Sequence, residues 1–104
     1  MAEDVRKSEL FAVFSKIDES ELKVVRKLIN EVIFLEQQMD ELRKLPFISV
    51  HPNNPAMQKS TAAAKQYKEC SQSYMNAVRI LLSVLRKEDT TEQNELLSML
   101  KEYL

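Results

Sequence analysis

Few residues in this chain have side chains suited to a catalytic or metal-binding centre. His51 is the only histidine and Cys70 the only cysteine among 104 residues. A Cys-His dyad or a His-containing metal site would therefore combine this one histidine with residues distant in the sequence. Cys70 falls on the apolar stripe of a predicted helix, where an unpaired cysteine is typically a small hydrophobic residue rather than a reactive thiol. We interpret His51, between Val50 and Pro52, as a loop residue.

The carboxylates nearest to a functional grouping are Glu36, Asp40 and Glu41. They lack the Glu-x-x-His pattern of di-metal helical bundles, and we expect them on or beside the outward face of a helix as partners of Arg43 and Lys44. The chain contains no glycine, although phosphate-binding loops and nucleophile elbows usually require it. We therefore predict that the protein is not an enzyme and uses no cofactor or metal ion.

Length and charge favour a small protein with a binding or structural role. A chain of 104 residues forms one domain, residues 1–104, and is short for an enzyme with a buried cleft. No segment approaches the roughly 20 consecutive apolar residues of a membrane span, and the first ten residues lack the apolar core of a secretory signal. The single cysteine fits a reducing compartment. We expect a cytoplasmic protein with no membrane partner.

All three prolines lie in one break between two segments with heptad patterns. Proline removes a backbone donor and disfavours helix at the preceding residue, so we expect the chain to turn over residues 46–54. Asp18, followed three residues later by Glu21, is a typical helix start and predicts a long helix over about 19–45. A second long helix is predicted over about 55–87; its heptad pattern runs from Thr61 to Lys87, and Pro55, with Asn54 as cap, is its earliest start. Two helices of similar length across one turn indicate an antiparallel hairpin.

Shorter helices are predicted at both ends, over about 4–17 and about 91–103. The predicted fold class is thus all-α, a hairpin of two long helices with a short helix at each end. Heptad packing is typical of coiled-coil-like association between copies, with further helices covering the wider apolar stripe. The candidate oligomer seam consists of the heptad residues Val25, Leu28, Val32, Leu35, Met39, Leu42, Tyr67, Tyr74 and Leu81.

Charge is unevenly distributed along the chain. Residues 55–87 carry six basic side chains against one acidic side chain, Glu69, whereas residues 88–104 carry five acidic against one basic. The basic side chains indicate either a solvated helix face, partly neutralised by the acidic tail, or a surface for the phosphate backbone of duplex DNA. Tyr67 and Tyr74, at helical spacing on the apolar stripe, are interpreted as core residues rather than base-stacking platforms. The candidate DNA-backbone contacts are Lys59, Lys65, Lys68, Arg79, Arg86 and Lys87.

The break and the start of the second long helix also carry a family resemblance, over about residues 40–80. This stretch resembles one found in small helical proteins of phages and prophages of Gram-positive bacteria that are grouped with the terminase small subunits. The resemblance implies a non-catalytic DNA-packaging component of the bacterial host cytoplasm that assembles into a ring, recognises phage DNA and works with a large subunit carrying ATPase and nuclease activity. The matching residues are Leu45-Pro46-Phe47-Ile48, His51-Pro52-Asn53-Asn54-Pro55, Gln58-Lys59, Thr61 and Ala63-Ala64-Lys65-Gln66-Tyr67-Lys68-Glu69.

The chain departs from the fuller members of such families at its amino-terminal end. Those proteins commonly place a helix-turn-helix domain before the oligomerisation hairpin, whereas residues 1–17 have room for one short helix. DNA contact would then fall to the basic face of the second long helix, alone or repeated in a ring, and would carry little sequence information. The alternative function is a helical protein-protein interaction module, an adaptor or inhibitor, with no nucleic-acid role.

Overall fold

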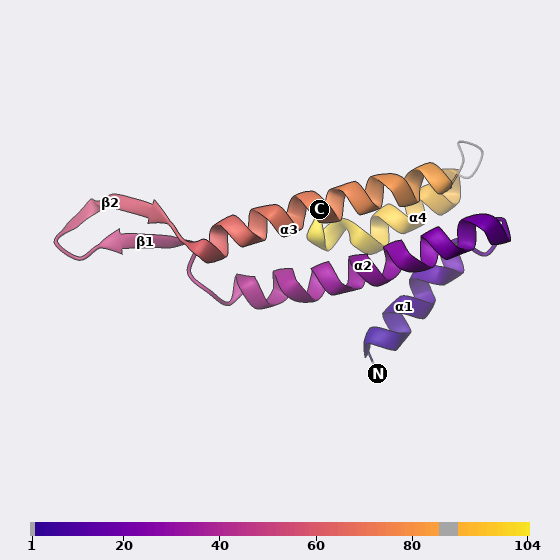
Figure 1. Ribbon diagram of the computed structural model, residues 1–104, viewed down its shortest axis with the longest axis horizontal. Coiled ribbons are helices and arrows are strands. Elements are labelled where there is room, and N and C mark those ends of the chain that lie inside the picture. The colour runs from indigo at the N-terminus through magenta and orange to yellow at the C-terminus, as the bar shows by residue number, and fades with distance from the viewer. Residues whose placement is uncertain (1, 86–89) are drawn as a thin grey trace.

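The computed structural model describes residues 2–85 and 90–104 (Figure 1). Two long helices lie side by side and antiparallel, and a two-stranded ribbon projects from the end where the chain passes between them. The molecule measures 60 × 30 × 21 Å, with a radius of gyration of 17.2 Å, against about 13 Å for a compact chain of this length. The elements in chain order are α1 (Ala2–Val13), α2 (Glu19–Arg43), β1 (Ile48–His51), β2 (Asn54–Ser60), α3 (Ala62–Val84), α4 (Thr90–Leu100) and a 3-10 turn, η1 (Lys101–Tyr103).

The first long helix begins where the sequence predicts it. Asp18 is the N-cap of α2, with extended backbone (φ −69°, ψ 153°), and its carbonyl accepts hydrogen bonds from the amides of Glu21 and Leu22. The helix ends at Arg43, slightly before the predicted end at residue 45. Pro46 accounts for this earlier end, because it disfavours helical backbone at the residue before it.

The ribbon corrects the prediction for the proline-rich break. Residues 46–54 were expected to form a turn and residue 55 to start the second helix, but β1 and β2 pair in antiparallel fashion over residues 48–60 and α3 begins at Ala62. The fold is therefore mostly helical rather than purely α. The Thr61 hydroxyl determines where α3 starts, because it accepts the N-cap bond from the Ala64 amide at 3.1 Å.

Thr61 also closes the base of the ribbon. Its amide donates to the Phe47 carbonyl at 3.2 Å, and its hydroxyl donates to the Pro46 carbonyl at 2.7 Å. The turn at the other end of the ribbon forms without glycine. A register shift after Val50 and the fixed φ of Pro52 bend the chain there. No described residue has a positive φ. The lack of glycine therefore does not prevent a hairpin of strands here.

The core lies between the α2–α3 hairpin and a layer made by α1 and α4, which contact each other. Leu10, Val13 and Phe14, at the spacing of one helix face, are buried, and α1 ends at Val13, before the predicted end at residue 17. Apolar side chains from all four helices share this interior, which is why the ends of the chain are needed to complete it. The fully buried residues are Leu10, Phe14, Val25, Ile29, Val32, Met39, Tyr74, Leu81, Leu96 and Leu100.

The residues predicted as a seam between copies lie inside a single chain. Seven of them are buried, and Leu28 and Tyr67 are partly buried against the same core. The heptad pattern is satisfied by packing α2 on α3 within one molecule. In this fold a contact between copies therefore has to use side chains that stay at least partly exposed.

Candidate nucleic-acid interface

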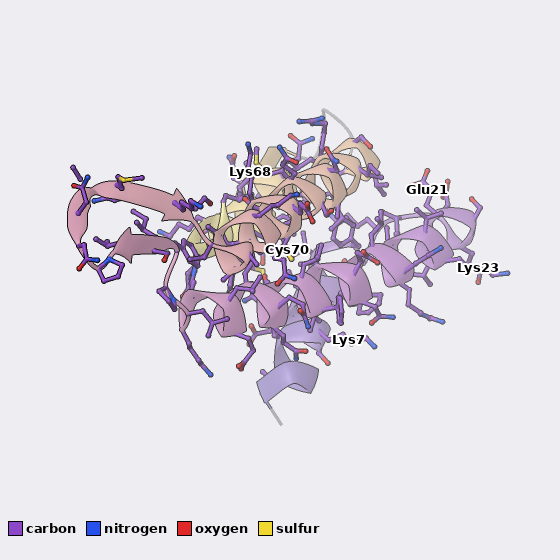
Figure 2. The ribbon with its side chains drawn as sticks, turned by 60° about the vertical axis from the view of Figure 1, so that its left-hand side comes forward. Lys7, Glu21, Lys23, Lys68 and Cys70 are labelled. Carbon is purple, nitrogen blue, oxygen red and sulfur yellow. The ribbon has the colours of Figure 1, made fainter. Side chains whose placement is uncertain are left out.

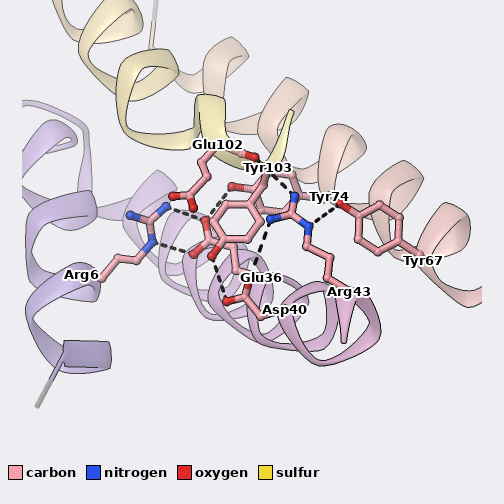
Figure 3. A network of polar contacts seen from close by, with 8 residues as sticks. All are labelled: Arg6, Glu36, Asp40, Arg43, Tyr67, Tyr74, Glu102 and Tyr103. Carbon is pink, nitrogen blue, oxygen red and sulfur yellow. Dashed lines mark hydrogen bonds and ion pairs between the residues drawn. The ribbon is translucent and has the colours of Figure 1, made fainter. Parts of the chain in front are cut away.

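A buried carboxylate joins four parts of the fold. Glu36 on α2 is 3% exposed and accepts both hydrogen bonds of a bidentate pair with Arg6 of α1, each 2.6 Å long (Figure 3). The Tyr74 hydroxyl of α3 donates to the same carboxylate at 2.6 Å, and Arg6 also donates to the Met99 carbonyl of α4 at 3.1 Å. Glu36 was expected on the outward face as a partner of Arg43, and this prediction is wrong. Its place four residues after Val32 turns it towards the core.

These contacts raise the pKa of Arg6 and of Tyr74. The hydrogen bond to Glu36 raises the pKa of Arg6, so the guanidinium stays charged. Burial, followed by the hydrogen bond to Glu36, raises the pKa of the Tyr74 hydroxyl and keeps it protonated as a donor. Both groups are thus held in the states that bind the carboxylate. The cluster is built to fix the helices rather than to exchange protons.

A second polar group secures the carboxyl-terminal end. Arg43 donates to the Tyr67 hydroxyl at 3.0 Å and to the Glu102 carbonyl at 3.4 Å, and its guanidinium lies 5.3 Å from the centre of the Tyr103 ring (Figure 3). The Tyr103 hydroxyl donates to Asp40 at 3.0 Å. Burial and this hydrogen bond raise the pKa of Tyr103 to about 12.

Two of the predicted carboxylate partners are confirmed. Asp40 lies 4.0 Å from the Arg43 guanidinium, and Glu41 lies 3.0 Å from the Lys44 ammonium group. Both pairs are at i, i+3 on exposed helix surface, where such pairs add only a few tenths of a kcal/mol. Asp40 and Glu41 thus have the basic partners that the sequence predicts.

The structure describes four of the six predicted DNA-contact residues. Lys59 on β2 and Lys65, Lys68 and Arg79 on α3 are exposed. Arg86 and Lys87 lie outside the described residues. Across residues 2–85 and 90–104, the four described side chains form no hydrogen bond or ion pair, in contrast to the engaged guanidinium groups of the two clusters above.

The helical repeat places the α3 cations on the outer side of that helix. Lys65 and Arg79 are 14 residues apart, which returns them to nearly the same side and separates them by about 21 Å along the axis. Lys68 points away from α2, whereas Cys70 faces α2 (Figure 2). Cys70 is partly buried against the core, as expected for a small hydrophobic residue.

The ribbon adds one further basic residue beyond the helices. Lys59 is the only Lys, Arg, Asp or Glu residue of the ribbon, and between Pro46 and Lys68 there is no acidic side chain. His51, interpreted from the sequence as a loop residue, is the last residue of β1. The ribbon is the element that sequence reasoning missed. Its signal is the alternation of Ile48 and Val50 around Ser49, which is the period of two of a strand.

Within the described ranges, no group of three or more His, Cys, Asp or Glu side chains is placed to hold a metal ion. Of the helices described, none combines the length and apolar character needed to cross a bilayer.

No family model, curated protein or solved structure matches this chain.

Proposed function

We propose that this chain is a non-catalytic phage DNA-packaging component, similar to a terminase small subunit, that assembles into an oligomer and contacts the phosphate backbone of duplex DNA. A packaging motor, in the form of a terminase large subunit, would be its further partner. The resemblance over residues 40–80 supplies the biological setting. The exposed cations on α3 and β2 supply the contact surface.

The observation that carries this proposal is the unpaired state of those cations. Lys59, Lys65, Lys68 and Arg79 lie on exposed surface with Glu69 as the single acidic residue of α3, and in the described structure none of them is neutralised by a carboxylate. Four phosphate contacts give a salt slope of about −3.6, equivalent to about 150-fold weaker binding per chain between 50 and 200 mM salt. A ring of copies multiplies this weak individual affinity.

Assembly has a surface available on the hairpin. Two shallow hollows between α2 and α3 share Ser73 in their lining and together form a groove. One contains Cys70 and the other Leu28 and Ile80, beside polar and charged residues, and Ile80 is 46% exposed. Apolar side chains left at the surface in this way favour contact with another helical surface. This groove replaces the buried heptad residues as the proposed contact between copies.

The test measures binding of a fluorescent duplex by anisotropy at several salt concentrations. We expect steep loss of affinity with salt, and further loss when Lys65, Lys68 and Arg79 are all changed to Glu. The matched control changes three exposed basic residues outside α3, the ribbon and the groove to Glu, namely Lys23, Arg26 and Lys101, so that net charge changes equally. Light scattering checks that the oligomer is unchanged. Absence of binding at low salt by the assembled wild type, or equal loss in both triple variants, would overturn the DNA contact.

The groove between α2 and α3 also favours a second candidate, a helical interaction module that binds a protein partner. Light scattering separates the two in part. A discrete higher oligomer supports the packaging role, whereas a monomer or simple dimer without DNA affinity supports an adaptor or inhibitor whose groove between α2 and α3 accepts a helix.

A further inference from the structure

We propose that the β1–β2 ribbon is a DNA-binding arm that enters the minor groove and bends the duplex. This inference rests on the proposed function, because it assumes that the protein binds duplex DNA, and it names the element and the groove involved. The ribbon is exposed, and its base is anchored to the helices. It carries a lysine, and hydrogen-bonding groups lie near its tip.

The ribbon has no core of its own. Every described side chain from Ile48 to Ser60 is exposed, including Ile48, Val50 and Met57, which are each at least 50% exposed. A two-stranded ribbon is at best marginally stable when isolated in water. Its apolar side chains and free edges therefore need a partner surface outside the described fold.

The base of the ribbon is fixed while its tip projects (Figure 1). Thr61 bonds to the carbonyls of Pro46 and Phe47, and the Phe47 ring packs against Tyr67 with 5.2 Å between centroids. Tyr67 is in turn held by Arg43 of α2. The arm is thus attached to both long helices, and a force at its tip is transmitted to the hairpin.

Charge favours a polyanion such as DNA over a basic surface as the occupant. From Pro46 to Lys68 the chain has three lysines and no carboxylate. Lys59 on the ribbon leads directly to Lys65 and Lys68 on the proposed backbone-binding face of α3. A polyanion that runs along α3 would therefore meet the ribbon without crossing a region of negative charge.

The tip carries the chemistry that the minor groove accepts. Asn54 uses its amide oxygen to accept a hydrogen bond from the Ala56 amide at 3.2 Å, so its N–H₂ group remains a donor. Gln58 and Lys59 add further donors along β2. A·T pairs present acceptors in this groove, so donors of this kind match A·T-rich DNA.

Apolar side chains beside these donors supply the wedge. Val50, Pro52 and Met57 line an open hollow on the ribbon. Proline and methionine are among the residues that minor-groove proteins insert between base steps, and such insertion kinks the duplex. The combination of donors and apolar wedge on one projecting ribbon favours bending over simple contact with phosphates.

The experiment uses the full chain as an oligomer and a duplex of 30 base pairs with a donor and acceptor dye at its ends. We expect energy transfer to rise on binding, and binding to A·T-rich DNA to be about ten-fold tighter than to G·C-rich DNA. Distamycin, which occupies the A·T minor groove, should abolish the rise. Met57→Ser should reduce the bend, whereas Phe34→Ser, a matched change at an exposed apolar residue of α2, should leave it unchanged.

A second variant replaces residues 48–60 by a short Gly-Ser linker, so that the test does not depend on correct folding of a substituted ribbon. We expect this variant to keep its helices, its oligomeric state and its salt-dependent binding, but to lose bending and A·T preference. Wild-type binding without bending or A·T preference, equal bending by the linker variant, or a changed oligomer in that variant would overturn the arm. Absence of any wild-type binding would instead overturn the proposed function.

Discussion

Removal of Arg6 tests whether the buried polar cluster joins the helices. Arg6→Met replaces the arginine by an unbranched apolar side chain and so removes the guanidinium. In the described structure, the Tyr74 hydroxyl is then the remaining side-chain donor to Glu36. Loss of one partner from a fully buried pair costs about 3–5 kcal/mol. The Arg6 side chain is 30% exposed, so water reaches the site, and we expect a loss of about 2–3 kcal/mol in the free energy of unfolding.

Urea unfolding followed by far-ultraviolet circular dichroism measures this loss. In thermal unfolding the midpoint should fall by about 10–20 °C, because each kcal/mol corresponds to about 4–8 °C in a domain of this size. Arg26→Met is the matched control, since Arg26 is exposed on α2 and lies outside the cluster. The control should change the free energy of unfolding by less than about 0.5 kcal/mol.

A double variant identifies the cause of the loss. Arg6→Met combined with Glu36→Gln removes the stranded charge but keeps an acceptor for Tyr74, so it should be more stable than Arg6→Met alone. The reasoning is refuted if Arg6→Met and Arg26→Met have equal stability. If the double variant is no more stable than the single one, the cost does not come from a buried unpaired carboxylate.

Three further substitutions test the core and the carboxyl-terminal contacts by urea unfolding. Tyr74→Phe removes the hydroxyl that donates to Glu36 and should cost about 1–3 kcal/mol, while an unchanged stability would contradict a hydrogen bond at this place. Met39→Ala, at a site with 0% exposure, should cost about 2–5 kcal/mol, and a loss below about 0.5 kcal/mol would argue against its burial. The pKa of Tyr103 rises from 10.0 to about 12 on folding, so its contribution is complete below pH 10 and is lost as pH rises from about 10 to about 12. Tyr103→Phe should flatten this part of the stability curve, and a curve identical to the wild type would oppose the assignment.

The helices could be predicted because their apolar side chains repeat with helical period. Leu10, Val13 and Phe14 recur at the spacing of one helix face, and all three are buried. The heptads of the two long helices likewise identify the residues that face each other. The same pattern does not specify whether the facing helix belongs to the same chain, and this is why a core seam resembled a seam between copies.

The ribbon and the buried carboxylate depend on information that local patterns lack. Residues 54–60 contain no strong strand former, and their conformation is determined by pairing with β1 and by the hydrogen bonds of Thr61. Glu36 is buried because Arg6, 30 residues earlier, reaches it from another helix. Sequence spacing gives the face on which Glu36 lies, but the position of α1 follows only from the tertiary packing.

The candidate contact residues were predictable as a surface but not as a site. The outward placement of Lys65 and Arg79 follows from their helical spacing, and their exposure agrees with it. Lys59 was assigned to the same helix, whereas it lies on the ribbon. DNA contact at these residues remains a prediction, because exposure alone is also typical of a solvated face.

The bond from Arg6 to the Met99 carbonyl has a consequence for the order of folding. It joins groups 93 residues apart, whereas α2 and α3 are linked by a short ribbon and contact each other over their length. Contacts between distant parts of a chain require the closure of a longer loop and form more slowly. We expect the hairpin to form first and the layer of α1 and α4 to close last. Amide hydrogen exchange should then be faster in α1 and α4 than in α2 and α3, and uniform protection would contradict this order.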